Sequence, residues 1–314
     1  MRSFLFLMTL FLSSTLNAQI KKGEDTIHLK VKRLNDTYID AFLKRPKNNE
    51  KVPLLIMCQG SGTGSMTAPF LAVTEQWKDR LGRLVIEKAG VSFGDEGDKI
   101  SDLYKTNNII SNRLNDYLRV LQYLRANAGW WNGEVYVIGG SEGGLLAGLI
   151  ASYYPNVKGV AILGFGGGLT FKEAWPKAKR IQKKAEGYSE IQLEQVEQSA
   201  LDTIEMAKKN PIYTLSYDGN DNTYAWWASI VDLRLSNTLT DLNIPIYVAH
   251  GSEDNMMPVA SAKNLKEEFT KQGKTNITFK EYVGYDHGFT DQAGKSHYAK
   301  VFMDAISWML ASKN

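Results

Sequence analysis

Short apolar runs suited to buried strands recur along the chain, at residues 54–58, 84–86, 135–138, 160–163, 246–249 and 277–282. Runs of this length are typical of strands that are buried on both faces of a sheet. Most of them are separated by helical stretches, among which are residues 107–127, 143–153, 259–272 and 296–312. Strands and helices in alternation predict an α/β fold, with a mostly parallel central sheet and helices on both of its faces.

Further features of the sequence indicate how the fold begins, how its core is stabilised and which partners are excluded. Residues 27–31 and 38–43 alternate apolar and polar positions, which predicts an antiparallel hairpin before the first buried strand. A chain of 314 residues can bury a core without disulfides or a structural metal, and its one cysteine, Cys58, lies in a predicted strand as an inert thiol. The 37 basic and 34 acidic side chains form no basic stripe, so we expect no nucleic-acid partner.

The first 18 residues predict a cleaved secretory signal peptide. Arg2 supplies a positive charge, residues 4–12 form a short apolar core, and small and polar residues lead to Ala18. This apolar run is too short to cross a bilayer as a permanent helix, so we expect no stable membrane insertion. We therefore expect an exported protein, periplasmic or secreted after cleavage near Ala18, with its mature domain at residues 19–314.

One region, at about residues 166–241, interrupts the alternation of strands and helices. No buried strand is evident there, and Lys, Glu, Gln and Ala dominate residues 172–209. The pattern predicts a helical insertion between two strands, which we interpret as a lid on the same domain. A surface insertion without a role is the alternative.

The segment Gly139-Gly140-Ser141-Glu142-Gly143 joins a predicted strand to a predicted helix. The pattern G-x-S-x-G at such a turn is typical of a nucleophilic serine that is lifted above the sheet, beside a helix N-terminus. The alternative is a glycine-rich turn with an idle serine. We predict that Ser141 is the nucleophile.

Two later segments supply partners for Ser141. Asp254 follows the strand at residues 246–249, and His287 follows the strand at residues 277–282. A histidine titrates near neutral pH and suits a general base, while the acid orients it. Glu253 is the nearest rival of Asp254, which could instead cap the next helix.

The negatively charged oxygen that forms during acyl transfer needs hydrogen-bond donors. Backbone N–H groups are available after the strand that ends at Cys58 and after the nucleophile. We predict that the N–H groups of Ser61 and Glu142 form this oxyanion hole.

These motifs resemble those of the α/β-hydrolase superfamily over essentially the whole mature chain. Within it, the chain is similar to serine-aminopeptidase-like and prolyl-oligopeptidase-like hydrolases, and less closely to acyl-CoA thioesterases. The resemblance rests on residues 139–144, 250–254, 286–289 and 87–92. Two positions depart from many members: Gln59 replaces a histidine in the oxyanion loop, and Gly140 replaces a side chain before the nucleophile. The resemblance implies an α/β-hydrolase fold with an inserted helical lid.

The predicted function is an exported, carboxylesterase-like serine hydrolase that cleaves an ester, or an amide or thioester, through an acyl-enzyme. Its partner would be a small-molecule ester or acyl substrate, and the sequence implies no metal and no organic cofactor. Trp226 and Trp227 in the insertion, with Met256 beside the acid, predict an apolar acyl pocket. Alternatively the aromatic residues fasten the insertion to the sheet.

Three alternatives remain open. In a small-peptide aminopeptidase, lid carboxylates would bind the substrate ammonium, and Glu190, Glu194 and Glu197 are the candidates. An acyl-CoA thioesterase is the second, and a binding protein on an inactive hydrolase fold is the third. The sequence makes no prediction of the oligomeric state.

Overall fold

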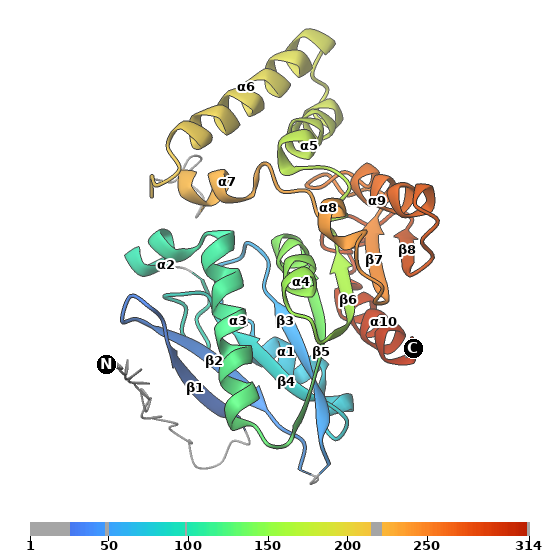
Figure 1. Ribbon diagram of the computed structural model, residues 1–314. Helices are drawn as coiled ribbons and strands as arrows, with labels where there is room; N and C mark the ends of the chain where they lie inside the picture. Colours follow the sequence, from blue (N-terminus) through green and yellow to red (C-terminus); the bar gives the residue numbers. More distant parts are fainter. Residues whose placement is uncertain (1–25, 48–49, 98, 215–221, 313–314) are drawn as a thin grey trace, which may run out of the picture.

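A computed structural model describes residues 26–47, 50–97, 99–214 and 222–312 (Figure 1). The predicted signal peptide lies outside these residues and stays a prediction. The described chain forms an eight-stranded sheet in the order β1-β2-β4-β3-β5-β6-β7-β8. No helix of the described residues is both long enough and apolar enough to span a membrane.

The strands lie close to the predicted runs. They are β1 (Ile27–Lys32), β2 (Tyr38–Lys44), β3 (Val52–Cys58), β4 (Gly82–Ile86), β5 (Trp131–Gly140), β6 (Val157–Leu163), β7 (Ile246–Gly251) and β8 (Ile277–Tyr282). β1 and β2 form the predicted antiparallel hairpin, and β2 pairs antiparallel with β4. All further pairs in the sheet are parallel. The predicted α/β fold is therefore confirmed.

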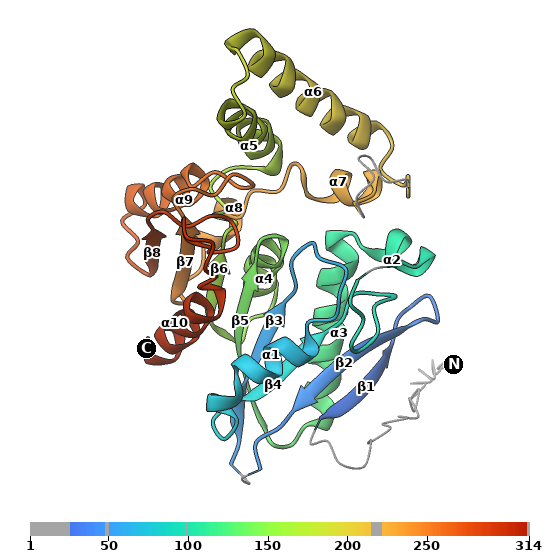
Figure 2. The same cartoon turned by 180° about the vertical axis from the view of Figure 1, so that it is seen from behind.

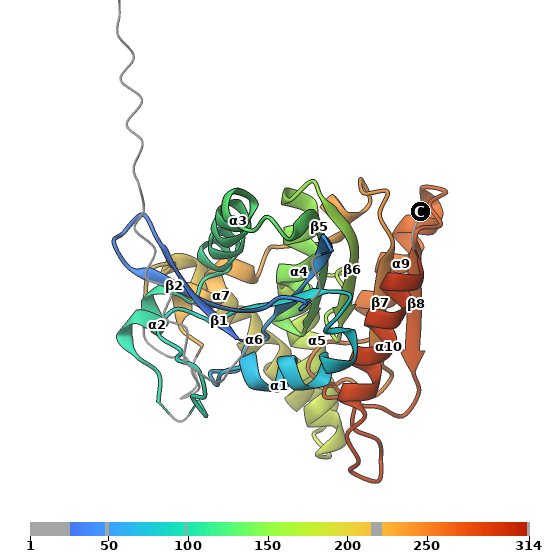
Figure 3. The same cartoon turned by 90° about the horizontal axis from the view of Figure 1, so that it is seen from below.

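Helices cover both faces of the sheet (Figures 2 and 3). Their bounds are α1 (Thr67–Val73), α2 (Asp102–Asn107), α3 (Ile110–Asn127), α4 (Glu142–Tyr153), α9 (Ala260–Lys271) and α10 (Tyr298–Ala311), with a 3₁₀ turn at Glu75–Trp77. Residues of α3, α4 and α9 pack in one apolar cluster, and residues of α1 and α10 pack in a second. Successive residues of a strand enter opposite clusters, as Ile56 and Met57 do, because side chains alternate across a pleated sheet.

Two predicted elements differ from the structure. The helix expected at residues 107–127 begins three residues later, at Ile110, because Ile109 is extended, and Asn107 instead ends the separate short helix α2. The strand at residues 277–282 is half-exposed rather than buried. It is the last strand of the sheet, so its outer edge pairs with no further strand of the described chain.

Four helices lie between β6 and β7 in the described part of residues 166–241: α5 (Phe171–Ala185), α6 (Glu190–Lys209), α7 (Tyr224–Ile230) and α8 (Ser236–Leu239). Thr170 with Glu173, and Ser189 with Gln192, form capping boxes that start α5 and α6. In Figure 1, α5, α6 and α7 stand beyond the carboxyl ends of β6 and β7. The insertion thus lies at the carboxyl ends of the parallel strands, where Ser141 follows β5.

Candidate active site

Ser141 lies between the last residue of β5 and the first residue of α4, with φ 54° and ψ −128°. This positive φ is strained for a residue with a side chain, at a cost of about 1–3 kcal/mol. Glycines on both sides make the turn possible: a Cβ on Gly139 would lie 2.0 Å from the Gly143 oxygen. A Cβ on Gly143 would lie 2.1 Å from the Cys58 oxygen of β3. Only glycine at both positions lets strand and helix approach this closely.

The structure brings Ser141, His287 and Asp254 together. His287 Nε2 lies 3.0 Å from Ser141 Oγ, and His287 Nδ1 lies 2.8 Å from Asp254 Oδ2. Asp254 follows β7 and His287 follows β8, whereas Ser141 follows β5. The three side chains therefore meet at the carboxyl ends of three strands of the sheet. In this arrangement the imidazole can take the serine proton while the carboxylate holds the imidazole.

Asp254 is buried, and four groups donate to it or face it. The Met256 and Met257 N–H groups donate to Oδ1, and His250 Nε2 lies 3.1 Å from Oδ2. Burial alone raises the pKa of Asp254, but hydrogen bonds from His250 and His287 outweigh burial and hold that pKa well below its usual range. The carboxyl group is therefore ionised near neutral pH. Its rival Glu253 is exposed and accepts only from Ser252 Oγ.

His250 is a neighbour of Asp254 to which the sequence analysis assigned no role of its own. It is fully buried, and its Nε2 also lies 2.7 Å from the Met257 carbonyl oxygen. His250 and His287 therefore both contact Asp254 Oδ2. The signal available in the sequence was its place four residues before Asp254, at the end of β7. The two remaining histidines pair elsewhere, His28 with Asp40 and His297 with Asp291.

Ser61 and Glu142 line the same cavity as Ser141 and His287. Glu142 is the first residue of α4, so its N–H has no acceptor within the helix. The Ser61 N–H has no acceptor in the part of the chain that the structure describes. Both N–H groups are therefore available to a substrate oxygen.

The two departures from the α/β-hydrolase pattern have structural explanations. The Gln59 amide donates to the carbonyl oxygens of Gly62 and Gly64, so it holds the loop after β3 in its curve. A Cβ on Gly140 would lie 2.3 Å from the Tyr298 hydroxyl of α10. Tyr298 thus fills the space that a side chain before the nucleophile would need.

The cavity at Ser141 has a volume of about 230 Å³. Its walls are mainly aromatic and aliphatic, and they include the predicted Trp226, Trp227 and Met256. Trp226 and Trp227 are buried at 4% exposure each and also belong to the apolar cluster beneath α7, whereas Met256 is half-exposed. The two indoles therefore serve both as cavity wall and as core.

Charged groups at the cavity are few. Glu142 is paired with Arg113, and the insertion contributes Lys179, whose Nζ lies 5.8 Å from the centre of the Trp175 ring. Lys179 has no carboxylate within 4 Å among the described residues. The glutamates considered for binding an ammonium group lie elsewhere: Glu190 and Glu197 pair with Arg180, and neither they nor Glu194 line the cavity.

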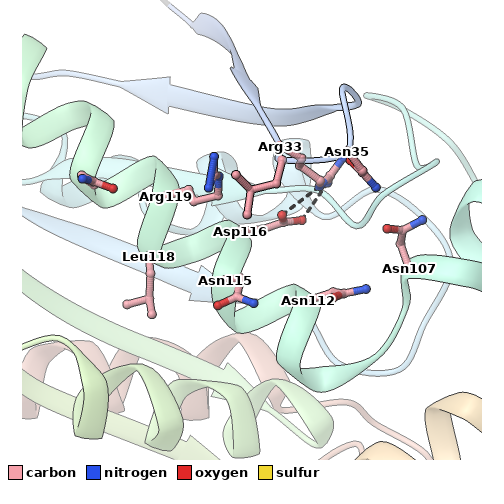
Figure 4. Close-up of a pocket in the computed structure, with 10 residues that line it drawn as sticks. Arg33, Asn35, Asn107, Asn112, Asn115, Asp116, Leu118 and Arg119 are labelled. Carbon is pink, nitrogen blue, oxygen red and sulfur yellow. Dashed lines mark hydrogen bonds and ion pairs between the residues drawn. The ribbon is translucent and has the colours of Figure 1, made fainter. Parts of the chain in front are cut away.

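A larger cavity of about 420 Å³ lies on the outer side of α3, beside the turn between β1 and β2 (Figure 4). Arg33 and Asp116 form a two-point ion pair there, at 2.8 and 2.7 Å, and asparagine side chains surround it. None of the predicted site residues lines this cavity. We therefore take the smaller cavity at Ser141 as the candidate active site.

The described residues offer neither a reactive thiol nor a metal site. Burial raises the pKa of the Cys58 thiol to about 12, so hardly any thiolate forms near neutral pH. No group of His, Cys, Asp or Glu side chains within the described ranges could hold a metal ion.

Several solved structures share the fold of this chain. Est1E from Butyrivibrio proteoclasticus, in a complex with ferulic acid, is 17% identical with a TM-score of 0.60, covering 91% of this chain and 98% of that one. An esterase from Pyrococcus furiosus is 14% identical with a TM-score of 0.59, covering 91% and 90%. An acylaminoacyl peptidase from Pyrococcus horikoshii is 12% identical with a TM-score of 0.59, and the match covers 95% of this chain but 42% of the peptidase.

The chain has the α/β-hydrolase fold. The predicted resemblance to this superfamily is thereby confirmed. A model of the dienelactone hydrolase family matches residues 212–311, less than half of the chain, in a part that includes β7, β8 and α10. Among curated protein sequences, none is significantly similar to the chain. The family match and the esterase neighbours support a hydrolase.

The contacts of Asp254 predict how two neighbouring acids differ. Asp254→Asn should lower kcat by about 10⁴-fold, because an amide favours the wrong imidazole tautomer. The matched control Glu253→Gln should stay within about threefold of wild type, since Glu253 is exposed. Steady-state kinetics on a p-nitrophenyl ester measure both. If the two variants exchanged their effects, Glu253 would be the acid.

Proposed function

We propose that this α/β-hydrolase is a serine hydrolase that cleaves a small-molecule ester through an acyl-enzyme. His287 removes the proton of Ser141 as Oγ attacks the carbonyl carbon, and the N–H groups of Ser61 and Glu142 bind the resulting oxyanion. His287 then protonates the leaving group, and a water activated by the same imidazole releases the acid. Asp254 stabilises the imidazolium in both steps.

The observation that carries this proposal is the unbroken chain of contacts from Ser141 Oγ through His287 to Asp254, at 3.0 and 2.8 Å, at the wall of a cavity. A binding protein on an inactive fold has no need for this alignment. A complete set of nucleophile, base and acid therefore favours catalysis over binding alone.

The cavity walls favour a substrate with an apolar acyl group. Phe171, Trp175 and Trp227 pack closely in edge-to-face and tilted arrangements, with 4.4 Å between the ring centres of Trp175 and Trp227. Aromatic walls of this kind suit aliphatic or aromatic groups. A cavity of about 230 Å³ is too small to enclose a large polymer, so only the acyl end of a substrate would be bound inside it.

The charge at the cavity mouth disfavours the aminopeptidase alternative. An ammonium group would meet Lys179, and the glutamates of α6 lie outside the cavity. An anionic substrate group would instead be attracted to Lys179.

We further propose that the protein is exported after cleavage near Ala18, on the pattern of its first residues.

Ser141→Ala should abolish turnover and leave the fold intact, because alanine fits the same turn. Loss of the nucleophile costs about 10⁴ to 10⁶ in rate in comparable hydrolases. A fluorophosphonate probe should label the wild type and spare the variant, and the two melting curves should coincide. Activity within tenfold of wild type would remove Ser141 from the mechanism.

A substrate panel tests the choice of bond. We expect p-nitrophenyl esters and methyl ferulate to be hydrolysed faster than aminoacyl anilides and acyl-CoA thioesters. Methyl ferulate is included because the similar Est1E structure contains ferulic acid. Faster cleavage of an anilide would instead indicate a peptidase, and faster cleavage of a thioester would indicate a thioesterase.

Trp227→Ala should both enlarge the acyl cavity and weaken the core. Each additional buried methylene is worth about 0.8 kcal/mol, so octanoate should gain over acetate by about fourfold for each methylene that enters the new space. The lost indole should also lower the free energy of unfolding by about 3–5 kcal/mol. Trp226→Ala should behave in the same way.

The matched control for these variants is Trp77→Ala, which removes a buried indole from the other face of the sheet. It should lower the melting temperature without changing the ratio of octanoate to acetate hydrolysis. A uniform loss on acetate, butyrate and octanoate esters in the Trp226 and Trp227 variants would contradict the pocket role and leave a core role.

Lys179→Glu should reverse the preference of the site for charge. Two partly solvated unit charges near each other interact by about 1–2 kcal/mol, or about tenfold in a rate ratio. The ratio of kcat/KM for the p-nitrophenyl monoester of adipate to that of hexanoate should fall at least tenfold. The control Lys177→Glu lies on the same helix outside the cavity and should leave the ratio unchanged. Equal ratios in wild type and Lys179→Glu would rule out an attraction between Lys179 and an anionic group of the substrate.

A further inference from the structure

Arg113 of α3 is buried between the two backbone segments that border the nucleophile. Its Nη1 lies 2.6 Å from Glu142 Oε1, and its Nη2 donates to the Gln59 carbonyl oxygen at 2.5 Å. The Arg113 and Glu142 side chains are 5% and 3% exposed. One guanidinium group thus ties the loop after β3 to the first residue of α4.

We propose that Arg113 is a positioning residue that assembles the oxyanion hole of this site. The inference rests on the proposed function, because it assigns Arg113 to the two N–H donors at Ser61 and Glu142. Arg113 does not touch the substrate in this arrangement. It acts by holding the two donors at a constant separation and by neutralising a charge beside them.

The first argument is geometric. The carbonyl groups of the two peptide units that flank the Ser61 N–H are held by donors, Gln59 by Arg113 and Ser61 by the Tyr104 hydroxyl at 3.5 Å, and the next carbonyl, of Gly62, accepts from Lys88 Nζ at 2.9 Å. A peptide unit carries its C=O and N–H in opposite directions, so holding the flanking carbonyls restricts rotation of the unit between them. Arg113 forms the shortest of these three contacts.

The second argument is electrostatic. Glu142 contributes an N–H donor to the oxyanion, yet its own side chain is a buried acid. Burial alone raises the pKa of Glu142, but the charges of Arg113 and Lys88 outweigh burial and hold that pKa below its usual value. The carboxyl group is therefore ionised, and without Arg113 a negative charge would lie beside the developing oxyanion. Arg113 cancels that repulsion.

The structure supplies a matched control on the same helix. Asp116, three residues after Arg113, forms the second buried ion pair of α3 with Arg33, facing the turn between β1 and β2 (Figure 4). Arg33→Met breaks a buried pair of similar exposure away from the nucleophile. It therefore reports the loss of activity that follows from loss of stability alone.

The experiment compares Arg113→Met with Arg33→Met on a carbonyl ester and on its thiono analogue, in which sulfur replaces the carbonyl oxygen. Both variants should lower the melting temperature. Arg113→Met alone should lower kcat for the carbonyl ester by about 10²- to 10³-fold, the range for loss of an oxyanion donor, with KM within about threefold. The preference for the carbonyl ester over the thiono ester should also fall by tenfold or more, because sulfur accepts hydrogen bonds poorly.

A double variant keeps the test decisive should Arg113→Met fail to fold. Arg113→Met with Glu142→Gln removes both charges of the buried pair, and it retains the backbone N–H of residue 142. Its kcat should lie at least tenfold below that of Glu142→Gln alone. The proposal is overturned if the two are equal, or if Arg113→Met loses no more kcat than Arg33→Met and keeps the wild-type preference between the two esters.

Failure of the proposed function is distinguishable from these results. It would be seen as wild-type protein that neither reacts with a fluorophosphonate nor hydrolyses any ester of the panel. Failure of the inference about Arg113 would instead leave an active, labelled enzyme in every variant of Arg113.

Discussion

The backbone of α4 begins so close to β3 and β5 that no side chain fits between them. The Cys58 oxygen occupies the position of a Cβ on Gly143, and the Gly143 oxygen occupies that of a Cβ on Gly139. This contact forces the chain through the strained turn at Ser141, and it sets the start of the helix directly beside the end of β3. This contact brings the loop after β3 and the first N–H of α4 close together, and Arg113 then ties the two segments to each other.

The same crowding decides how charge is arranged around the nucleophile. A helix start offers unpaired N–H groups and a partial positive charge, but Glu142 adds a buried carboxylate at that point. Arg113 and Lys88 offset the carboxylate. Asp254, also buried, is stabilised by two N–H groups and two histidines. Each buried acid near the site thus has its own donors, and the imidazole of His287 lies between serine and acid, where it can exchange a proton with Oγ.

The insertion between β6 and β7 supplies the walls of the cavity rather than its chemistry. Trp226 and Trp227 of α7 face the cluster around α3 and α4, whereas most residues of α6 are exposed. An insertion built in this way can change the shape of the acyl site without disturbing the triad, because the triad residues all follow strands of the sheet. Much of the cavity wall therefore comes from a different part of the chain than Ser141, Asp254 and His287.

The sequence by itself determined the strands, the turn at Ser141 and the places of Asp254 and His287, because each is a local pattern at the end of an apolar run. It did not reveal that the strand at residues 277–282 would be a half-exposed edge, since that depends on the order in which distant strands pair. Arg113 contacts Glu142, which lies 29 positions later in the chain, and Gln59, which lies 54 positions earlier. No local pattern in the sequence indicates these contacts. Only the tertiary structure decided which buried charges meet, because ion pairing depends on where the helices pack against the sheet.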